Sequence, residues 1–159
     1  MNYKIMPIKS FEAAKMSPAK KVVKNILVRD IMTKNLILFR PKDSIHDVMK
    51  SFIKYKISGG PVVNKYGDLM GIISEADCMK EISESRYFNM PILDKSVYHF
   101  MTKDVETIEA NTSVFDAAST FFTSKRRRLP VLDKKRLVGQ ISRKDIVIAA
   151  LNLKSQTWH

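Results

Sequence analysis

The sequence has a single cysteine, Cys78, among its 159 residues. An internal disulfide is therefore excluded, and the composition suits a reducing cytoplasm. No run approaches the roughly 20 consecutive apolar residues that a transmembrane helix needs, and the first residues lack the apolar segment of a secretory signal. We therefore expect a cytoplasmic protein that does not span a membrane.

Groups that catalyse reactions or bind metals are also scarce. None of the three histidines, His46, His99 and His159, has a second ligand at the spacing of a zinc site. Neither of the glycine-rich phosphate motifs, Walker-type or dinucleotide-binding, is present. Cys78 has no base beside it, which favours a buried small hydrophobic residue over a nucleophile. We expect no enzymatic activity, no metal site and no catalytic cofactor.

Acidic residues are few, with 16 Asp and Glu against 28 Lys and Arg, so the net charge is +12. Residues 1–29 hold seven basic residues and one acidic residue, so this segment alone contributes 7 − 1 = +6. We interpret residues 1–26 as a basic N-terminal arm. Such an arm is either a solubilising tail or a contact for nucleic acid, although it lacks the interleaved aromatic and basic residues typical of the latter.

One stretch of the sequence occurs twice. Residues 71–77 are Gly-Ile-Ile-Ser-Glu-Ala-Asp, and residues 139–145 are Gly-Gln-Ile-Ser-Arg-Lys-Asp. Each copy predicts a strand that ends at a serine, followed by a helix whose third residue is the aspartate. The exposed amide groups of such a helix start bind phosphate readily, and the aspartate offers acceptors to sugar hydroxyls. The same pattern is also an ordinary capping box, which a single copy would favour, but its repetition shifts the balance towards a binding role.

The repetition extends to whole units of structure. The pair Met32-Thr33 returns as Met101-Thr102 at an offset of 69, and the glycine motif returns at an offset of 68. The pattern predicts a helical turn over 28–33, a strand over 36–39, a helix from 45 that ends near Gly59-Gly60, strands over 61–64 and 69–73, and a helix over 75–85. We therefore expect a mixed α/β (α+β) fold with two β-α-β-β-α repeats, which pack as a pseudo-two-fold pair because neither buries enough apolar surface alone.

The expected segments follow from these patterns. They are an arm over 1–26, a first repeat over 27–85, a linker over 86–95, a second repeat over 96–152 and a tail over 153–159. Two apolar stripes predict the core-facing sides of the middle helices. Their members are Ile45, Val48, Met49, Phe52 and Ile53 in the first repeat, and Val114, Ala117, Ala118, Phe121 and Phe122 in the second.

These motifs together resemble a tandem pair of CBS (cystathionine β-synthase) domains, an arrangement called a Bateman module. The resemblance covers about residues 27–152 and depends on the Met-Thr start, the strand that begins with proline and the Gly-x-x-Ser-x-x-Asp end. All three occur in both copies. We expect a stand-alone protein of this family, with no enzyme or channel fused to the pair.

The resemblance implies two unequal clefts, each combining a serine and an aspartate of one repeat with the segment before the strand proline of the other. The aspartate would hold ribose hydroxyls, and the serine with its helix start would face phosphate. The first site would combine Ser74 and Asp77 with Thr102, Thr107, Arg126, Arg127, Arg128 and Leu129. The second site would combine Ser142 and Asp145 with Thr33, Leu38, Ile57, Ser58, Gly59 and Gly60.

The two implied sites differ in charge. Three consecutive arginines beside the first site suit phosphate oxygens, or they are a solvated helix end that interacts with the local dipole. The second site has a small neutral segment at the matching position. Glu106, where the family has an apolar residue, could accept a hydrogen bond from an adenine, could face water, or could weaken the first site by its charge.

The function implied is that of a non-catalytic regulatory module. It would bind AMP, ADP, ATP or S-adenosylmethionine between the repeats and signal by a change of conformation or association to a separate effector protein. Homodimers through the exposed faces of helices 75–85 and 143–153 are implied as well. The alternative is a nucleic-acid-binding protein that uses the basic arm, with the paired repeats as a dimerisation scaffold.

Overall fold

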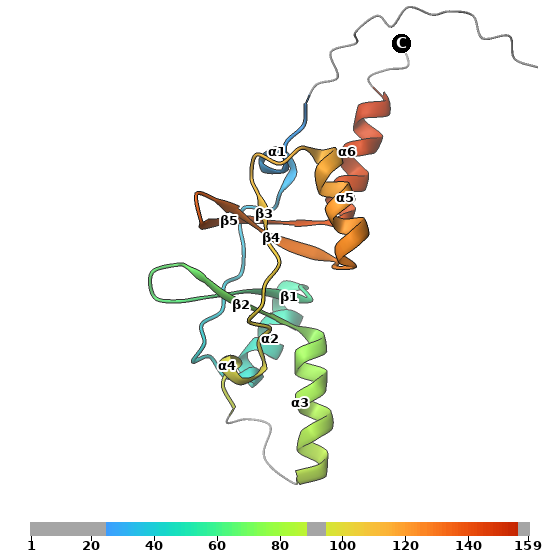
Figure 1. The fold of residues 1–159 in the computed structure, drawn as a ribbon. Coiled ribbons are helices and arrows are strands. Elements are labelled where there is room, and N and C mark those ends of the chain that lie inside the picture. The colour runs from blue at the N-terminus through green and yellow to red at the C-terminus, as the bar shows by residue number, and fades with distance from the viewer. Residues whose placement is uncertain (1–24, 89–94, 156–159) are drawn as a thin grey trace, which may run out of the picture.

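The computed structural model describes residues 25–88 and 95–155, and these residues form two similar units (Figure 1). The sheets of the two units face each other across the middle of the molecule, and the helices lie beyond them at the two ends. Among these residues no helix is both long enough and apolar enough to cross a membrane. In chain order the elements are α1 (Val28–Ile31), α2 (Ile45–Tyr55), β1 (Gly59–Val63), β2 (Leu69–Ser74), α3 (Glu75–Phe88), α4 (Val97–Phe100), β3 (Ile108–Glu109), α5 (Val114–Ser124), β4 (Arg128–Asp133), β5 (Arg136–Ser142) and α6 (Arg143–Ser155).

The sheets are built from two matching hairpins. β1 pairs antiparallel with β2, and β4 pairs antiparallel with β5, while β3 adds to β4 in parallel. The predicted strand over 36–39 is wrong, because only Phe39 pairs with the sheet, in a parallel bridge to Val62. Phe39 N donates to Pro61 O at 2.9 Å, and Val63 N donates to Phe39 O at 2.9 Å. The predicted mixed α+β class is otherwise confirmed, with the first strand of repeat one reduced to a single bridge.

Serine caps begin both middle helices, as predicted. Ser44 Oγ accepts from Asp47 N at 3.2 Å at the start of α2, and Ser113 Oγ accepts from Asp116 N at 3.1 Å at the start of α5. The predicted helix end at Gly59-Gly60 is wrong. α2 ends at Tyr55, and the left-handed residue that follows is Lys56, with φ of 52°.

The two glycines instead begin β1, where the chain approaches other backbone closely. A Cβ on Gly60 would lie 2.8 Å from Ile37 O and 3.0 Å from the Phe39 ring. A Cβ on Gly59 would lie 2.8 Å from Ile73 O. Close approach, rather than a helix end, is therefore the reason that glycine stands here.

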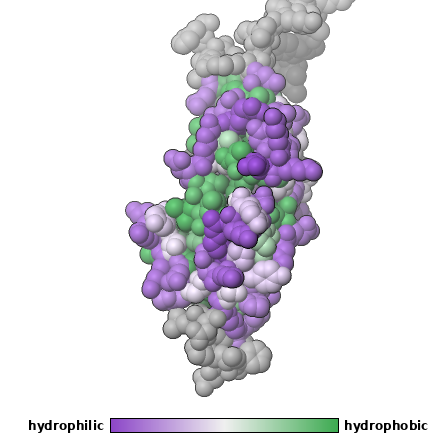
Figure 2. All heavy atoms as spheres, turned by 90° about the vertical axis from the view of Figure 1, so that its left-hand side faces the viewer, coloured by the Kyte–Doolittle hydropathy of each residue, from purple (hydrophilic) through white to green (hydrophobic). Residues whose placement is uncertain are grey.

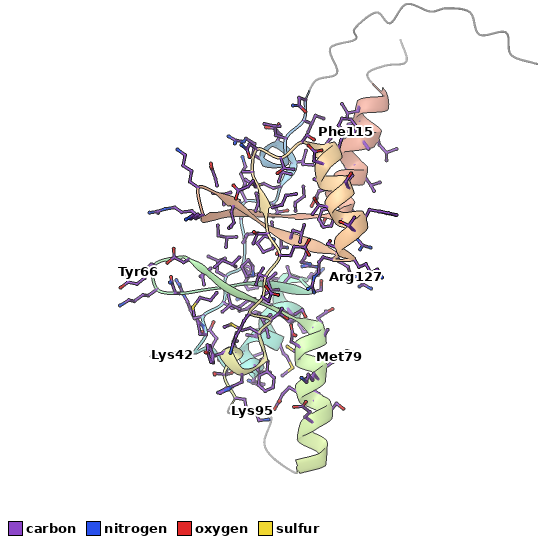
Figure 3. All side chains as sticks on the ribbon, in the orientation of Figure 1. Lys42, Tyr66, Met79, Lys95, Phe115 and Arg127 are labelled. Carbon is purple, nitrogen blue, oxygen red and sulfur yellow. The ribbon has the colours of Figure 1, made fainter. Side chains whose placement is uncertain are left out.

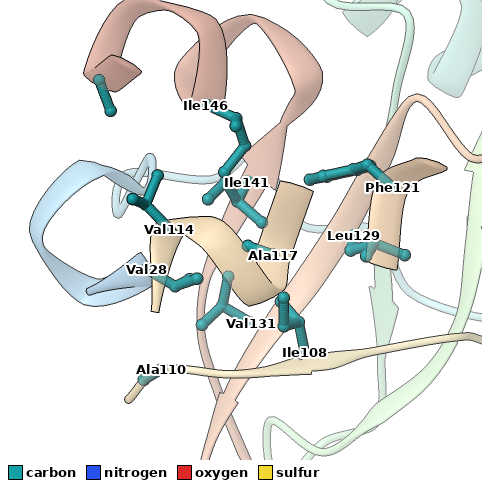
Figure 4. Close-up of a cluster of buried hydrophobic side chains, with 11 residues drawn as sticks. Val28, Ile108, Ala110, Val114, Ala117, Phe121, Leu129, Val131, Ile141 and Ile146 are labelled. Atoms are coloured by element: carbon teal, nitrogen blue, oxygen red, sulfur yellow. The ribbon is translucent and has the colours of Figure 1, made fainter. Parts of the chain in front are cut away.

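The opening turn of each repeat packs on the other repeat. Val28 of α1 belongs to the apolar core formed by α5, α6 and the second sheet (Figure 4), and Val97 of α4 belongs to the core of the first unit. Two backbone bridges join the repeats in the same way, since Thr33 pairs with Gln140 and Thr102 pairs with Ile72. The two bridges are related by the pseudo-two-fold symmetry, because their residues occupy matching positions in the repeats. Figure 2 shows hydrophobic side chains gathered along the middle of the face that carries the hairpin tips. The two repeats thus form one interlocked unit.

The last position of each predicted apolar stripe does not reach the core. Ile53 is 81% exposed and Phe122 is 88% exposed, although Phe52 and Phe121 beside them are buried. Ile53 and Phe122 each lie eight residues after the first position of their stripe. Over eight residues an α-helix makes two full turns and about 80° more, so the last side chain points about 80° away from the first. Each middle helix is covered on one side, so this position points away from the sheet. Ala118 was also predicted to face the core but is exposed. Met49 is half-buried. The stripe residues that are buried as predicted are Ile45, Val48, Val114 and Ala117.

The ends of several segments differ from the expected ones. α3 continues to Phe88, beyond the predicted end at 85, and α6 continues to Ser155. Residues 1–24, 89–94 and 156–159 lie outside the described residues, so the basic arm and the tail stay predictions. The division into two repeats with a linker also stays a prediction at its boundaries.

Candidate functional site

Two strand-to-helix turns carry the repeated serine and aspartate. We call residues 74–77 the first corner and residues 142–145 the second corner. Ser74 Oγ donates to Asp77 Oδ2 at 2.6 Å, and Ser74 N donates to the same oxygen at 2.8 Å. Asp77 N in turn donates to Ser74 Oγ at 3.4 Å. The second corner has the same geometry, with both donors of Ser142 at 2.7 Å from Asp145 Oδ2. Both predicted capping boxes are therefore present.

These capping boxes use one oxygen of each carboxylate. Within the described part of the chain, Oδ1 of Asp77 and Oδ1 of Asp145 make no hydrogen bond. Both aspartates are half-buried. Each corner therefore holds a carboxylate in a fixed orientation with one acceptor oxygen left for another group.

A cavity of about 470 Å³ lies between the two repeats beside the first corner, within the 300–1,000 Å³ range of small-molecule sites. In Figure 3, Arg127 lies where the two units meet, and α3, which carries Met79, begins close to it. The walls come from the first corner, the start of β1, the segment after α4 and the start of β4. The lining residues are Ser58, Gly59, Ile72, Ser74, Glu75, Ala76, Asp77, Met79, Thr102, Asp104, Val105, Glu106, Arg126, Arg127, Arg128 and Leu129.

The structure brings together nearly all of the first predicted site. Thr102 reaches the cavity because its backbone pairs with Ile72, with Thr102 N to Ile72 O at 2.9 Å and Ile72 N to Thr102 O at 3.0 Å. Thr107 is half-buried and does not line the cavity. The predicted residues that do line it are Ser74, Asp77, Thr102, Arg126, Arg127, Arg128 and Leu129.

The residues of the second predicted site do not gather around this cavity. Ser58 and Gly59 line it, so they lie beside the first corner. Thr33 pairs with Gln140, two residues before the second corner, and Leu38 is 45% exposed. The predicted residues that do not line the cavity are Thr33, Leu38, Ile57, Gly60, Ser142 and Asp145.

Several lining residues were not predicted. Glu75 and Ala76 lie inside the first corner, between its serine and its aspartate, and Met79 follows one turn later on α3. Asp104 and Val105 lie between Thr102 and Thr107, which the sequence singled out. The sequence could have indicated these residues, because they lie within or next to the predicted motifs. Whether their side chains face the cavity depends on how one repeat packs on the other.

The charge of the cavity is mixed. Arg126, Arg127 and Arg128 face Glu75, Asp77, Asp104 and Glu106 around the same space. Arg126 Nε lies 3.9 Å from Glu106 Oε2, and their side chains are 56% and 41% exposed. An exposed pair at this distance contributes under about 1 kcal/mol, so a phosphate could displace Glu106 from Arg126 at little cost. Glu106 therefore faces water and places its charge beside the arginines, while the role predicted for it towards a ligand stays a prediction.

Cys78 follows the first corner and is 3% exposed, as predicted for a small core residue. Burial, followed by the charges of Asp77 and Glu75, raises the pKa of its thiol to about 11. The thiol is therefore protonated at neutral pH and is a poor nucleophile. Across residues 25–88 and 95–155, no three His, Cys, Asp or Glu residues are grouped so that they could hold a metal ion.

Comparison with known proteins identifies the family. The family model of the CBS domain matches residues 28–84 and 97–152. The chain therefore belongs to the CBS domain family and carries the domain twice. It is 32% identical over 155 residues to protein MJ1426 of Methanocaldococcus jannaschii, covering 79% of this chain and 92% of that protein. It spans only 41% and 40% of two longer proteins of the same organism, MJ1225 and MJ1232.

Solved structures of paired CBS domains share the fold. The crystal structure of CBSX2 of Arabidopsis thaliana in complex with AMP has a TM-score of 0.70 and 31% identity, and the match covers 80% of this chain and 98% of that chain. The CBS domain pair of protein MJ0100 in complex with 5′-methylthioadenosine and S-adenosyl-L-methionine has a TM-score of 0.69 and 28% identity, with coverages of 80% and 98%. These neighbours confirm the predicted tandem arrangement.

Proposed function

We propose that the chain is a non-catalytic regulatory module that binds an adenosine-type ligand in the cavity beside the first corner. AMP, ADP, ATP and S-adenosylmethionine are the candidate ligands. The observation that carries this proposal is the joining of Asp77, from one repeat, with Arg126–Arg128, from the other, around one cavity of suitable volume. The structural neighbours that hold AMP, 5′-methylthioadenosine and S-adenosyl-L-methionine support the same ligand class.

The chemistry of the cavity suits a ribose and a phosphate. The capping box fixes Asp77 through Oδ2, so Oδ1 can accept a hydrogen bond from a ribose hydroxyl. The positive end of the α3 helix dipole and the forked donors of the arginines can bind phosphate oxygens. The ligand contacts both repeats, so it binds more tightly to one relative arrangement of the repeats than to another. This difference in affinity shifts the population towards the tighter-binding arrangement, which is the regulatory signal.

Replacing Asp77 by alanine is expected to weaken AMP binding by about 10- to 100-fold, because a charge-assisted hydrogen bond is worth about 1.5–3 kcal/mol. Thermal-shift and calorimetric titrations with AMP, ADP, ATP and S-adenosylmethionine measure the loss. Asp116→Ala is the matched control, because Asp116 also exchanges hydrogen bonds with the capping serine of its helix, Ser113, but lies outside the cavity. Equal ligand stabilisation of wild type and Asp77→Ala would show that the aspartate does not bind the ligand.

We also propose that two copies of the chain associate through their helical faces. Exposed apolar side chains lie on all four long helices, including Ile53 on α2, Met79 on α3, Phe122 on α5 and Val147 and Leu151 on α6. α3 of the first unit and α5 and α6 of the second lie on the side opposite the hairpin tips (Figure 1). A dimer would bury these residues, and ligand-dependent movement of the repeats would then change the contact between copies.

Phe122→Glu is expected to weaken this dimer about 30-fold or more, because a central aromatic anchor is typically worth at least 2 kcal/mol. Sedimentation across a range of protein concentrations measures the dissociation constant. Tyr66→Glu is the control, because Tyr66 is 74% exposed at the tip of the β1–β2 hairpin, away from the helices (Figure 3). A monomeric wild type, or a Phe122→Glu variant that dimerises as tightly as wild type, would exclude this interface.

A further inference from the structure

The second repeat carries an open groove on the helical side of the molecule. It measures about 430 Å³ and lies between the C-terminal half of α5 and the N-terminal half of α6. Its lining residues include Phe121, Phe122, Lys125, Arg143, Ile146 and Val147. Phe122 and Val147 are exposed, and so are the two basic residues, Lys125 and Arg143. The groove is thus apolar with positive charge along it, which suits an apolar ridge that carries negative charge.

The first repeat presents a ridge of this kind on α3. Glu75, Met79 and Ile82 lie four and three residues apart, so they share one face of the helix. All three are exposed. Lys80 and Glu84 pair with each other on a different side of α3. We call Glu75, Met79 and Ile82 the α3 ridge, and it combines exposed apolar side chains with an unbalanced negative charge.

The two repeats carry opposite charges where their last helices begin. Glu75 is the first residue of α3, and Arg143 is the first residue of α6, at the offset of 68. α3 and α6 lie on the same side of the molecule and run away from its middle in opposite directions (Figure 1). The pseudo-two-fold relation of the repeats therefore places a negative charge and a positive charge at equivalent points of one surface.

A second copy of the chain can meet this surface in two ways. In a parallel dimer each repeat faces the same repeat of the other copy, so Arg143 approaches Arg143, Glu75 approaches Glu75, and one groove lies on the other. In an antiparallel dimer each repeat faces the other repeat, so Glu75 approaches Arg143 twice, because contacts in a two-fold dimer are reciprocal. Like charges across an interface oppose association, whereas complementary charges fix its orientation.

We propose that two copies of the chain pair antiparallel, with the α3 ridge of each copy in the α5–α6 groove of the other. This arrangement matches a ridge with a groove and a negative charge with a positive one. It rests on the dimer proposed above and gives that dimer its orientation. Glu75 and Met79 also line the first cavity, so the second copy contacts the same end of α3 as the candidate ligand site.

Charge reversal at the two helix starts tests this orientation. In the antiparallel dimer, Glu75→Arg or Arg143→Glu alone turns two attractive contacts into two repulsive ones, and we expect each to weaken the dimer about tenfold. The double variant Glu75→Arg/Arg143→Glu restores opposite charges and should return the dissociation constant to within about threefold of wild type. Sedimentation of the full chain at several protein concentrations measures all four constants.

A parallel dimer gives a different result, because either reversal there exchanges one pair of like charges for another. Equal dissociation constants for the four proteins therefore overturn the antiparallel arrangement, as does a double variant that is no tighter than the single ones. Lys65→Glu is the matched control, since Lys65 Nζ lies 4.8 Å from the ring centre of Tyr66 at the hairpin tip, away from the helices (Figure 3). It should leave the constant unchanged. A monomeric wild type overturns the dimer and its orientation together.

Disulfide cross-linking measures the orientation without a change of charge. Met79→Cys and Val147→Cys each add one exposed thiol, on the ridge and in the groove, while the native Cys78 is buried. We expect a disulfide-linked dimer when the two variants are mixed, and none when either is oxidised alone. Linkage of either variant with itself, or none in the mixture, overturns the proposal. Neither experiment uses a ligand, so the proposed binding of an adenosine-type ligand is tested independently of them.

Discussion

Replacing Lys95 by isoleucine is expected to lower the free energy of unfolding by about 3 kcal/mol, because the change leaves a buried charge without a partner. Glu81 on α3 is fully buried, at 0% exposure. Its Oε2 accepts a hydrogen bond from Lys95 Nζ at 3.1 Å, and its Oε1 lies 2.9 Å from the same nitrogen. The lysine is 35% exposed, which places the expected loss at the lower end of the usual range for buried pairs. Urea denaturation measures it.

The second repeat shows how this charge pair can be removed. At the offsets of 69 and 68, Lys95 corresponds to Ile26 and Glu81 corresponds to Ala149. Ile26 packs against the second core, and Ala149 is buried at 3% exposure. The double variant Glu81→Ala/Lys95→Ile therefore installs the apolar pair of the other repeat, and we expect it to recover most or all of the lost stability.

Lys80→Ala is the control for these variants. Lys80 pairs with Glu84 at 3.9 Å on the exposed side of α3, so its loss should change the unfolding free energy by less than about 0.5 kcal/mol. If the double variant is no more stable than Lys95→Ile alone, the penalty does not come from the unpaired carboxylate of Glu81.

The repeated motifs predicted the local structure well, because each depends on residues close in sequence. Ser44, Ser74, Ser113 and Ser142 all cap their helices, since each serine oxygen accepts a hydrogen bond from the amide of the aspartate three residues later. The hairpins follow equally from short apolar runs separated by turn residues. The corners, which are the centre of the candidate site, were therefore predictable.

Features that depend on long-range packing were not predictable in this way. The exchange of α1 and α4 between the repeats joins residues far apart in the sequence, because the bridge of Thr33 to Gln140 spans 107 positions and that of Ile72 to Thr102 spans 30. Periodicity placed Ile53 and Phe122 in the core, but the sheet covers only one side of each helix. Likewise, Ser58 lines the first cavity, where it contacts Arg128 from the other repeat.

Gly71→Ala tests whether this exchange of opening turns builds the candidate site. A Cβ on Gly71 would lie 2.8 Å from Thr102 O and 2.9 Å from Met101 Sδ, so the added methyl group pushes against backbone that cannot easily give. We expect a loss of about 2 kcal/mol of stability or more from this overpacking, and separation of Thr102 from Ile72. Since Thr102 lines the cavity, AMP binding at the first corner should weaken as well.

Gly139→Ala is the symmetric variant, because its Cβ would meet Thr33 O at 2.9 Å and the Met32 side chain. It should cost similar stability but act on the second corner, leaving AMP affinity at the first corner closer to wild type.

Gly67→Ala is a control that adds backbone strain without steric crowding, since that hairpin glycine has φ of 88° and no atom within 4 Å of the added Cβ. It should cost stability by backbone strain alone, with AMP binding unchanged. If Gly71→Ala matches the wild type in urea midpoint and AMP affinity, the contact between Thr102 and β2 does not hold the cavity together, and its shape depends on the arginine-bearing wall instead.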